Sequence, residues 1–138
     1  MTPGTYTLLL SLSAPATITF GAAGERHLDR GWYAYTGSAF GPGGLSRVER
    51  HRRVAAGEHD VRHWHVDYLT GHPGTCLDAV YVTEDADREC DIAQALADAG
   101  EPIPGLGASD CDCETHVAYA PERGTLATVA DDAHESIR

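Results

Sequence analysis

Apolar residues alternate with polar residues and turn signals through the first third of the chain, a pattern that predicts short β-strands. Residues 5–12 form an almost continuous apolar run, which predicts a buried strand, and Ala14-Pro15 ends it. Residues 21–24 have the composition of a turn. We therefore expect the chain to open as a β-meander, with strands at residues 5–12, 17–20, 25–28 and 31–35.

Helical and strand patterns alternate in the rest of the chain. A glycine-rich loop before Leu45 and Gly57 after Ala56 bound a predicted helix. Residues 63–69 fit either a helix or a strand, and we favour a helix. The Val and Tyr content of residues 77–83 predicts a strand. We further expect a helix that Asp85 caps and that ends near Ala99, and a last strand at residues 116–120.

The chain has 138 residues, the length of one domain with its own core. We expect a compact domain over residues 1–122 and a frayed acidic tail over residues 123–138, because small and acidic residues dominate beyond Pro121. No apolar run approaches the roughly 20 residues of a membrane span, and no basic segment precedes a hydrophobic one at the start. These features predict a cytoplasmic protein without a membrane partner.

Acidic residues outnumber basic ones by 21 to 10, the formal net charge is −11, and every basic residue is an arginine. Acidic surfaces remain hydrated in concentrated salt, so we expect a halophilic protein in a salt-accumulating cytoplasm; GC-biased codon usage is the alternative. The net charge argues against non-specific coating of nucleic acid. Residues 45–56 reverse it locally to +3, with four arginines suited to close phosphate contacts: Arg47, Arg50, Arg52 and Arg53.

Three groups of side chains suggest chemistry. Tyr33 and Tyr35 are two residues apart on a predicted strand and therefore point to one face, although for Tyr33 we favour packing over catalysis. Arg47 and His51 are four residues apart on one stripe of a predicted helix. Glu89 lies on the apolar stripe of the later helix, where a carboxylate directed toward the core suggests a function. Phenols, a guanidinium, an imidazole and a carboxylate suit metal-assisted attack on a phosphodiester.

The order of these residues resembles the GIY-YIG nuclease superfamily, and more closely an archaeal-type branch of it. The resemblance extends to about Tyr119, and segments 31–39, 63–69 and 109–113 make it more specific. The two signature triplets are further apart than is usual in the superfamily, and an extra β-hairpin would absorb the difference. The matching motifs are Gly4-Thr5-Tyr6, Tyr35-Thr36-Gly37, the Arg47 and His51 pair, and Glu89 as the metal-binding glutamate.

The resemblance implies an α+β fold in which a small central antiparallel (mixed) β-sheet is flanked by helices, with an extra N-terminal hairpin. It implies hydrolysis of DNA, branched or damaged, with one Mg²⁺ or Mn²⁺ ion held by Glu89. Tyr6 or Tyr35 would help to deprotonate the attacking water, Arg47 would hold the scissile phosphate, and His51 would orient a tyrosine or the phosphate. The residues expected beside the substrate are Gly37, Ser38, Arg50, Arg52 and Arg53, and Arg50 or Arg52 would replace a lysine that some members use.

The four cysteines are not expected to form disulfides in a reducing cytoplasm. A Zn²⁺ site would use Cys111, Cys113 and His116, completed by Cys90 or by a histidine of segment 63–69, and buried thiols beside a loop are the alternative. A thiol enzyme is less attractive, because acidic residues flank the Cys111 and Cys113 pair and raise thiol pKa values.

Two further functions remain open on the sequence alone. One is a non-catalytic module that binds nucleic acid, and the other is a zinc-stabilised structural or adaptor domain. The sequence contains neither a phosphate-binding P-loop nor a dinucleotide fingerprint.

Overall fold

The computed structural model describes residues 3–20, 24–40, 43–57, 65–103 and 115–135. At its centre is a five-stranded sheet in the order β5-β1-β4-β7-β6, with every pairing antiparallel. The fold is therefore α+β, as the sequence predicted. The strands of this sheet are β1 (Gly4–Leu12), β4 (Gly31–Ala39), β5 (Thr75–Glu84), β6 (Glu101–Pro102) and β7 (Val117–Ala120).

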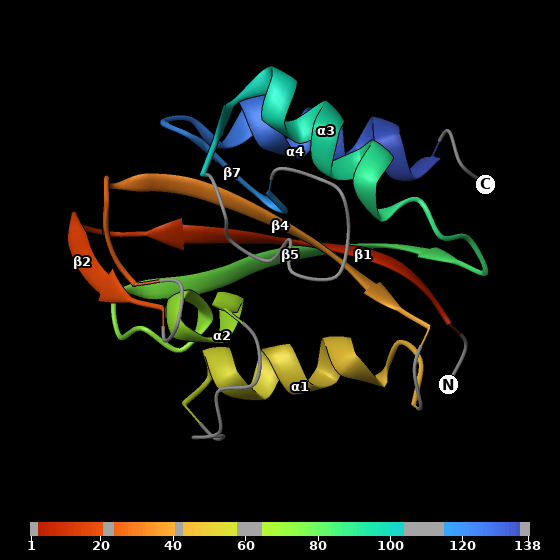
Figure 1. Cartoon of the computed structure of the whole chain (residues 1–138), viewed down its shortest axis with the longest axis horizontal. Helices are drawn as coiled ribbons and strands as arrows, with labels where there is room; N and C mark the ends of the chain where they lie inside the picture. The colour runs from red at the N-terminus through yellow and green to blue at the C-terminus, as the bar shows by residue number, and fades with distance from the viewer. Residues whose placement is uncertain (1–2, 21–23, 41–42, 58–64, 104–114, 136–138) are drawn as a thin grey trace.

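Helices cover both faces of the sheet, two on each (Figure 1). On one side are α1 (Ser46–Ala55) and the short α2 (His65–Thr70), which confirms the helix favoured for this ambiguous segment. On the other side are α3 (Glu89–Ala99) and α4 (Arg123–Glu135). Gly57, just beyond α1, has a φ of +78°, the left-handed conformation that commonly ends a helix.

Alternation along β1 gives each face of the sheet its own core. Tyr6, Leu8 and Leu10 point toward α1 and α2 and pack in a cluster that includes Val48 of α1. Leu9 points the other way and packs with Ile92 and Leu96 of α3 and with the inner face of α4. This double burial explains why both faces of β1 carry apolar residues, including the run Leu8 to Leu10.

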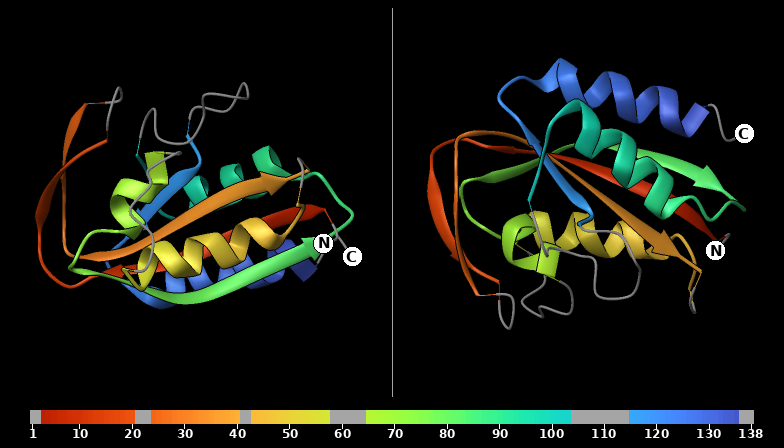
Figure 2. Two further views of the ribbon diagram at one scale, coloured as in Figure 1. Left: turned by 90° about the horizontal axis from the view of Figure 1, so that it is seen from below. Right: turned by 45° about the horizontal axis from the view of Figure 1, so that its top comes forward.

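The opening of the chain is not the meander expected from the sequence. β1 pairs directly with β4 along its whole length, from Gly4 opposite Ala39 to Leu12 opposite Gly31. In the sequence between β1 and β4, β2 (Ala16–Thr19) and β3 (Glu25–Leu28) form a separate two-stranded sheet, which lies at one end of the molecule (Figure 2). The extra hairpin predicted from the spacing of the triplets is therefore present, as an insertion between the two central strands.

The prediction of a frayed tail from residue 123 onward is also wrong, because residues 123–135 form α4. Leu126 and Ala130 of α4 are fully buried against the sheet, and His134, one turn further, is 1% exposed. Their spacing of four residues places them on one stripe of the helix. Residues 136–138 lie outside the described residues. None of the helices in the described segments is long and apolar enough to span a membrane.

The short strand β7 leaves part of β4 without a second neighbour. β7 pairs with residues 32–35 of β4, and the Thr36 N–H donates to the His116 carbonyl at 3.0 Å. From Gly37 to Ala39, β1 is the only strand beside β4 in the described part of the chain. Side chains from both layers of helices can meet at this open edge of β4.

Candidate functional site

Tyr6 and Tyr35 lie side by side on the α1 face of the sheet, with ring centroids 6.2 Å apart. Tyr6 is directly opposite Gly37 in the β1–β4 register, and both point to the same face. A Cβ atom at Gly37 would lie 2.6 Å from the Tyr6 hydroxyl and 3.0 Å from the Tyr35 ring. Gly37, expected beside the substrate, is instead buried beneath the two phenols, and the absence of a side chain there allows them to approach.

His51 of α1 completes a buried group with the two tyrosines. Its Nε2 atom is hydrogen-bonded to the Tyr6 hydroxyl at 2.8 Å, and its ring centroid is 5.4 Å from that of Tyr6 and 6.0 Å from that of Tyr35. The imidazole is fully buried, as expected for a helix residue in line with Val48 on the inner face of α1. His51 was expected to orient a tyrosine or the phosphate, and in the structure it is hydrogen-bonded to a tyrosine, Tyr6.

Arg47 precedes His51 by one turn and reaches back to the strand that leads into its helix. Its Nη1 donates to the carbonyl of Ser38 at 2.6 Å, so the half-buried guanidinium lies next to Gly37. Its positive charge lowers the pKa of both Tyr6 and Tyr35. Ser38 thus contributes its backbone to the placement of Arg47, whose guanidinium carries a planar set of N–H donors.

Glu89 comes from the opposite layer of helices, as the first residue of α3. Thr5, next to Tyr6 in β1, points to that layer: its hydroxyl donates to the Ala86 carbonyl at 2.6 Å and accepts from the Arg88 N–H at 3.0 Å. The segment before α3 is therefore fixed to β1 one residue away from Tyr6. Asp85, expected to cap this helix, instead adopts a φ of +58°, and the N-cap is Arg88, which makes no side-chain cap hydrogen bond.

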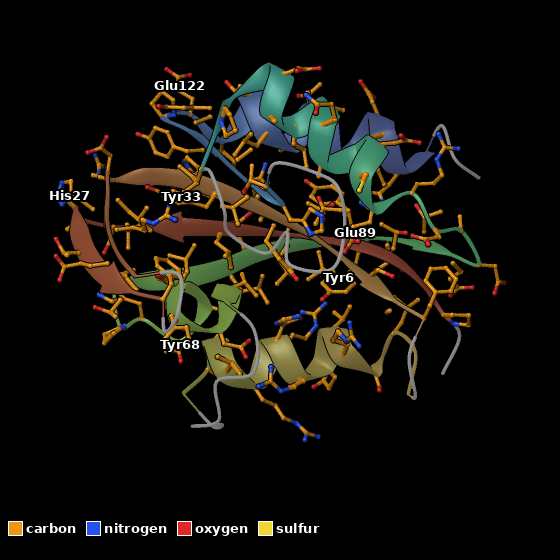
Figure 3. The ribbon with its side chains drawn as sticks, viewed as in Figure 1. Tyr6, His27, Tyr33, Tyr68, Glu89 and Glu122 are labelled. Carbon is orange, nitrogen blue, oxygen red and sulfur yellow. The ribbon has the colours of Figure 1, made fainter. Side chains whose placement is uncertain are left out.

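The open edge of β4 brings the Glu89 carboxylate close to the phenols. The carboxylate is 18% exposed and lies 3.5 Å from Nδ1 of the buried His116, at the start of β7. Its negative charge raises the pKa of Tyr6 and of Tyr35, which places it within electrostatic reach of both. Figure 3 shows Tyr6 and Glu89 near each other between α1 and α3, whereas His27 and Glu122 lie at the other end of the molecule.

Burial dominates the protonation of all three ring side chains. It raises the pKa of Tyr6 and Tyr35 well above the ordinary phenol value, because a phenolate would lose its hydration. It lowers the pKa of His51 to about 4, which Asp67 opposes and Arg50 and Arg47 reinforce. At neutral pH the site therefore contains two neutral phenols and a neutral imidazole.

Asp67 of α2 belongs to the site but was not predicted from the sequence. It is fully buried and accepts a hydrogen bond from Nη1 of Arg50 at 3.0 Å, and its Oδ2 forms an ion pair with Nη2 of Arg50, also at 3.0 Å. Its Oδ1 lies 3.7 Å from Nδ1 of His51. Arg50, expected beside the substrate, is thus bound to Asp67. The available signal was the mixed composition of segment 63–69, in which an acidic residue adjoins apolar ones, and it did not specify a partner.

The other arginines of α1 lie toward solvent. Arg52 is exposed and lies 4.0 Å from Glu49, and Arg53 is exposed as well. Tyr33, on the same face as Tyr35, donates to the Asp29 carbonyl at 2.7 Å, which matches the packing role favoured for it.

One of the ligands predicted for a zinc site is excluded by the structure. Cys90 is disulfide-bonded, against the expectation of free thiols, so its sulfur is not a thiolate that can bind a metal ion. Its partner lies outside the described residues, as do Cys111 and Cys113. His116 is buried against Glu89. In the described segments, no three His, Cys, Asp or Glu side chains gather to hold a metal ion.

One protein family matches residues 5–138, a range that begins at the second residue of β1 and includes the whole of β4 and α4. The chain belongs to the family described as Domain of unknown function DUF123. Neither the curated proteins nor the solved structures gave a match. The DUF123 range continues through α4, in agreement with the packing of that helix on the sheet.

Proposed function

We propose that this DUF123 domain is a metal-dependent endonuclease that hydrolyses DNA phosphodiester bonds, related to the GIY-YIG nucleases. The proposal is supported by the meeting of two phenols, a guanidinium, an imidazole and a carboxylate from four separate elements at one edge of β4. Packing alone does not require this combination of groups. Branched or damaged DNA is the proposed substrate, because such sites expose a phosphodiester outside a regular duplex.

Arg47 is the proposed phosphate ligand. Its guanidinium is fixed from one side by the Ser38 carbonyl, and its planar arrangement of donors suits two oxygens of a phosphate group. During hydrolysis, negative charge accumulates on the non-bridging oxygens, and a positioned guanidinium stabilises that charge more than it stabilises the ground state.

Tyr6 and Tyr35 are the proposed first acceptors of the proton from the attacking water. A buried phenol accepts a proton only after it has lost its own, so cations nearby must offset the effect of burial on its pKa. Arg47 does so for both residues, whereas the negative charge of Glu89 opposes it. Neutralisation of Glu89 by a cation would therefore favour the phenolate.

Glu89 fits the role of metal ligand for Mg²⁺ or Mn²⁺. It is a partly exposed carboxylate at an open strand edge, and these ions are often held by one or two protein carboxylates together with water and phosphate oxygens. Such an ion, when bound, would polarise the phosphate and the attacking water. The chain's own part is to hold Glu89 in place, through Thr5 and through His116.

Replacement of Arg47 with alanine tests this proposal. We expect the cleavage rate of branched DNA in Mn²⁺ to fall by about 10²- to 10³-fold, because one preorganised donor to the transition state is lost. Arg123→Ala is the matched control, since Arg123 is an exposed arginine paired with Asp78 away from the site, and it should cleave at the wild-type rate.

Thermal unfolding would show that both variants fold. Wild-type protein that binds DNA but cleaves neither branched, single-stranded nor duplex DNA with either metal ion would support the binding-module alternative instead. An Arg47→Ala variant with an undiminished rate would remove Arg47 from the site.

A further inference from the structure

Asp67 is a buried carboxylate that the proposed hydrolysis leaves without a role. It lies on α2, behind α1, and none of its side chain is exposed. Arg50 pairs with it through one hydrogen bond and one further ion-pair contact, both at 3.0 Å, which offsets the cost of a charge in the interior. If Asp67 served only to join α2 to α1, this pair would be sufficient. Asp67 also lies close to Nδ1 of His51, and this second contact suggests a role in the site.

The contacts of His51 define a direction for its proton. On one side, Oδ1 of Asp67 lies 3.7 Å from Nδ1, and on the other, the Tyr6 hydroxyl lies 2.8 Å from Nε2. A neutral imidazole carries one proton, and a carboxylate facing Nδ1 favours that proton on Nδ1. The opposite tautomer would point a lone pair at a negative charge between two fully buried side chains. With the proton on Nδ1, Nε2 accepts a hydrogen bond from the Tyr6 O–H.

We propose that Asp67 is a positioning residue that holds His51 in the Nδ1–H tautomer, so that Nε2 receives the phenolic proton of Tyr6 during hydrolysis. This inference rests on the proposed function. The Tyr6 O–H bond breaks as the Nε2–H bond forms, which leaves a phenolate and an imidazolium. The phenolate then takes a proton from the water whose oxygen attacks phosphorus.

The charges are balanced at each stage of this transfer. The imidazolium lies between the Asp67 carboxylate and the phenolate, so its positive charge has a negative neighbour on each side. Tyr35 lies beside Tyr6 on the same face of the sheet, with ring centroids 6.2 Å apart. After cleavage, His51 returns its proton through Tyr6 to the leaving oxygen or to solvent.

The tautomer of His51 can be measured without any substrate, by ¹⁵N NMR of the full chain labelled at histidine. His51→Gln identifies the resonances among the eight histidines. In the wild type, we expect the ¹⁵N chemical shift of Nδ1 to be that of a protonated ring nitrogen. The shift of Nε2 should be that of an unprotonated ring nitrogen that accepts a hydrogen bond. In Asp67→Asn, we expect a mixture of tautomers or a proton on Nε2. Asp78→Asn is the matched control, because Asp78 also pairs with an arginine, Arg123, and should leave the spectrum unchanged.

Kinetics give the second measurement. Asp67→Asn should lower kcat by about 10- to 100-fold with KM nearly unchanged, as for carboxylates that orient functional histidines. Asp78→Asn should retain the wild-type values. The double variant Asp67→Asn with Arg50→Gln removes both buried charges together and separates any loss of folding from a change of tautomer.

The outcomes distinguish this inference from the proposed function. A wild-type His51 protonated on Nε2, or an Asp67→Asn spectrum identical to the wild type in a folded protein, would refute the role of Asp67 even if DNA is cleaved. The expected tautomers in a protein that cleaves no DNA would instead refute the proposed function and leave Asp67 as the residue that sets the tautomer.

Discussion

Burial governs the charge state of His51 more than its neighbours do. Asp67 favours the protonated form, while Arg47 and Arg50 disfavour it, and these effects partly cancel. The loss of hydration in a fully buried site remains and lowers the pKa of His51 from 6.5 to about 4. The imidazole is therefore neutral at physiological pH, so one of its ring nitrogens can accept a hydrogen bond from the Tyr6 O–H.

This shift makes the stability of the fold depend on pH. The folded-state pKa is below the unfolded-state value, so the unfolded chain binds the proton more readily and stability falls as the pH drops from about 6.5 to about 4. At about 1.4 kcal/mol for each unit of pKa, a buried group shifted this far contributes on the order of 3 kcal/mol at neutral pH. Urea denaturation at pH 7 and at pH 4.5 should show that the difference in unfolding free energy between wild type and His51→Gln decreases by about 2 to 3 kcal/mol.

The exposed His27 provides the control for this measurement. Its substitution with glutamine measures, at each pH, the effect of removing an imidazole most of which is in water. An equal His51→Gln difference at both pH values would mean that His51 titrates in the folded protein as it does in the unfolded chain.

The residues of the candidate site differ in how far the sequence predicted them. Arg47 and His51 could be paired because a spacing of four on a helix fixes their relative direction. The contact between Tyr6 and Gly37 could not be derived from spacing, because the two residues are 31 apart in sequence and meet only through the register of β1 and β4. Asp67 was missed for a similar reason: it meets Arg50 and His51 only when α2 packs beside α1.

At the scale of elements, α4 illustrates why a helix with a polar sequence can still belong to a core. Its buried positions are occupied by Leu126, small alanines and His134, so its apolar stripe is weak and was interpreted as a tail. His134 joins β1 to its neighbour β5: its Nε2 and Nδ1 are each 2.8 Å from a threonine hydroxyl, Thr7 of β1 and Thr83 of β5. Thr83 also donates to the His134 carbonyl at 3.1 Å. Hydrogen bonds replace the apolar contacts that the pattern lacks.

Replacement of His134 with alanine should therefore destabilise the whole domain. The change removes a fully enclosed ring and leaves the hydroxyls of Thr7 and Thr83 without this partner, so we expect the free energy of unfolding to fall by about 2 to 4 kcal/mol. Asp131→Ala, at an exposed position of the same helix, should change it by less than about 0.5 kcal/mol. Equal effects of the two substitutions would mean that α4 contributes little to the fold.

At the scale of the whole molecule, acidic residues are in large excess over their basic partners. The arginines in described ion pairs are already matched by carboxylates, as in Arg88 with Asp91 and Arg123 with Asp78. With 21 acidic and 10 basic residues in total, many carboxylates have no cation available in the chain. Folding brings these like charges closer together, so their repulsion opposes the compact state. The same excess would repel DNA at long range, so the proposed recognition of DNA would depend on short-range contacts such as those of Arg47.

Potassium chloride should consequently stabilise this protein. Raising its concentration from about 0.1 M to 1 M shortens the Debye length from about 10 Å to about 3 Å and screens repulsion between surface carboxylates. We expect the melting temperature to rise by several degrees, since about 1 kcal/mol corresponds to roughly 2 to 8 °C for domains in this size range. A variant with Asp98, Asp131 and Asp132, all exposed on α3 and α4, changed to asparagine should gain less from the salt than the wild type does. A melting temperature that falls as KCl increases would show that repulsion among these carboxylates does not limit stability, and would remove the physical basis for a salt-adapted protein.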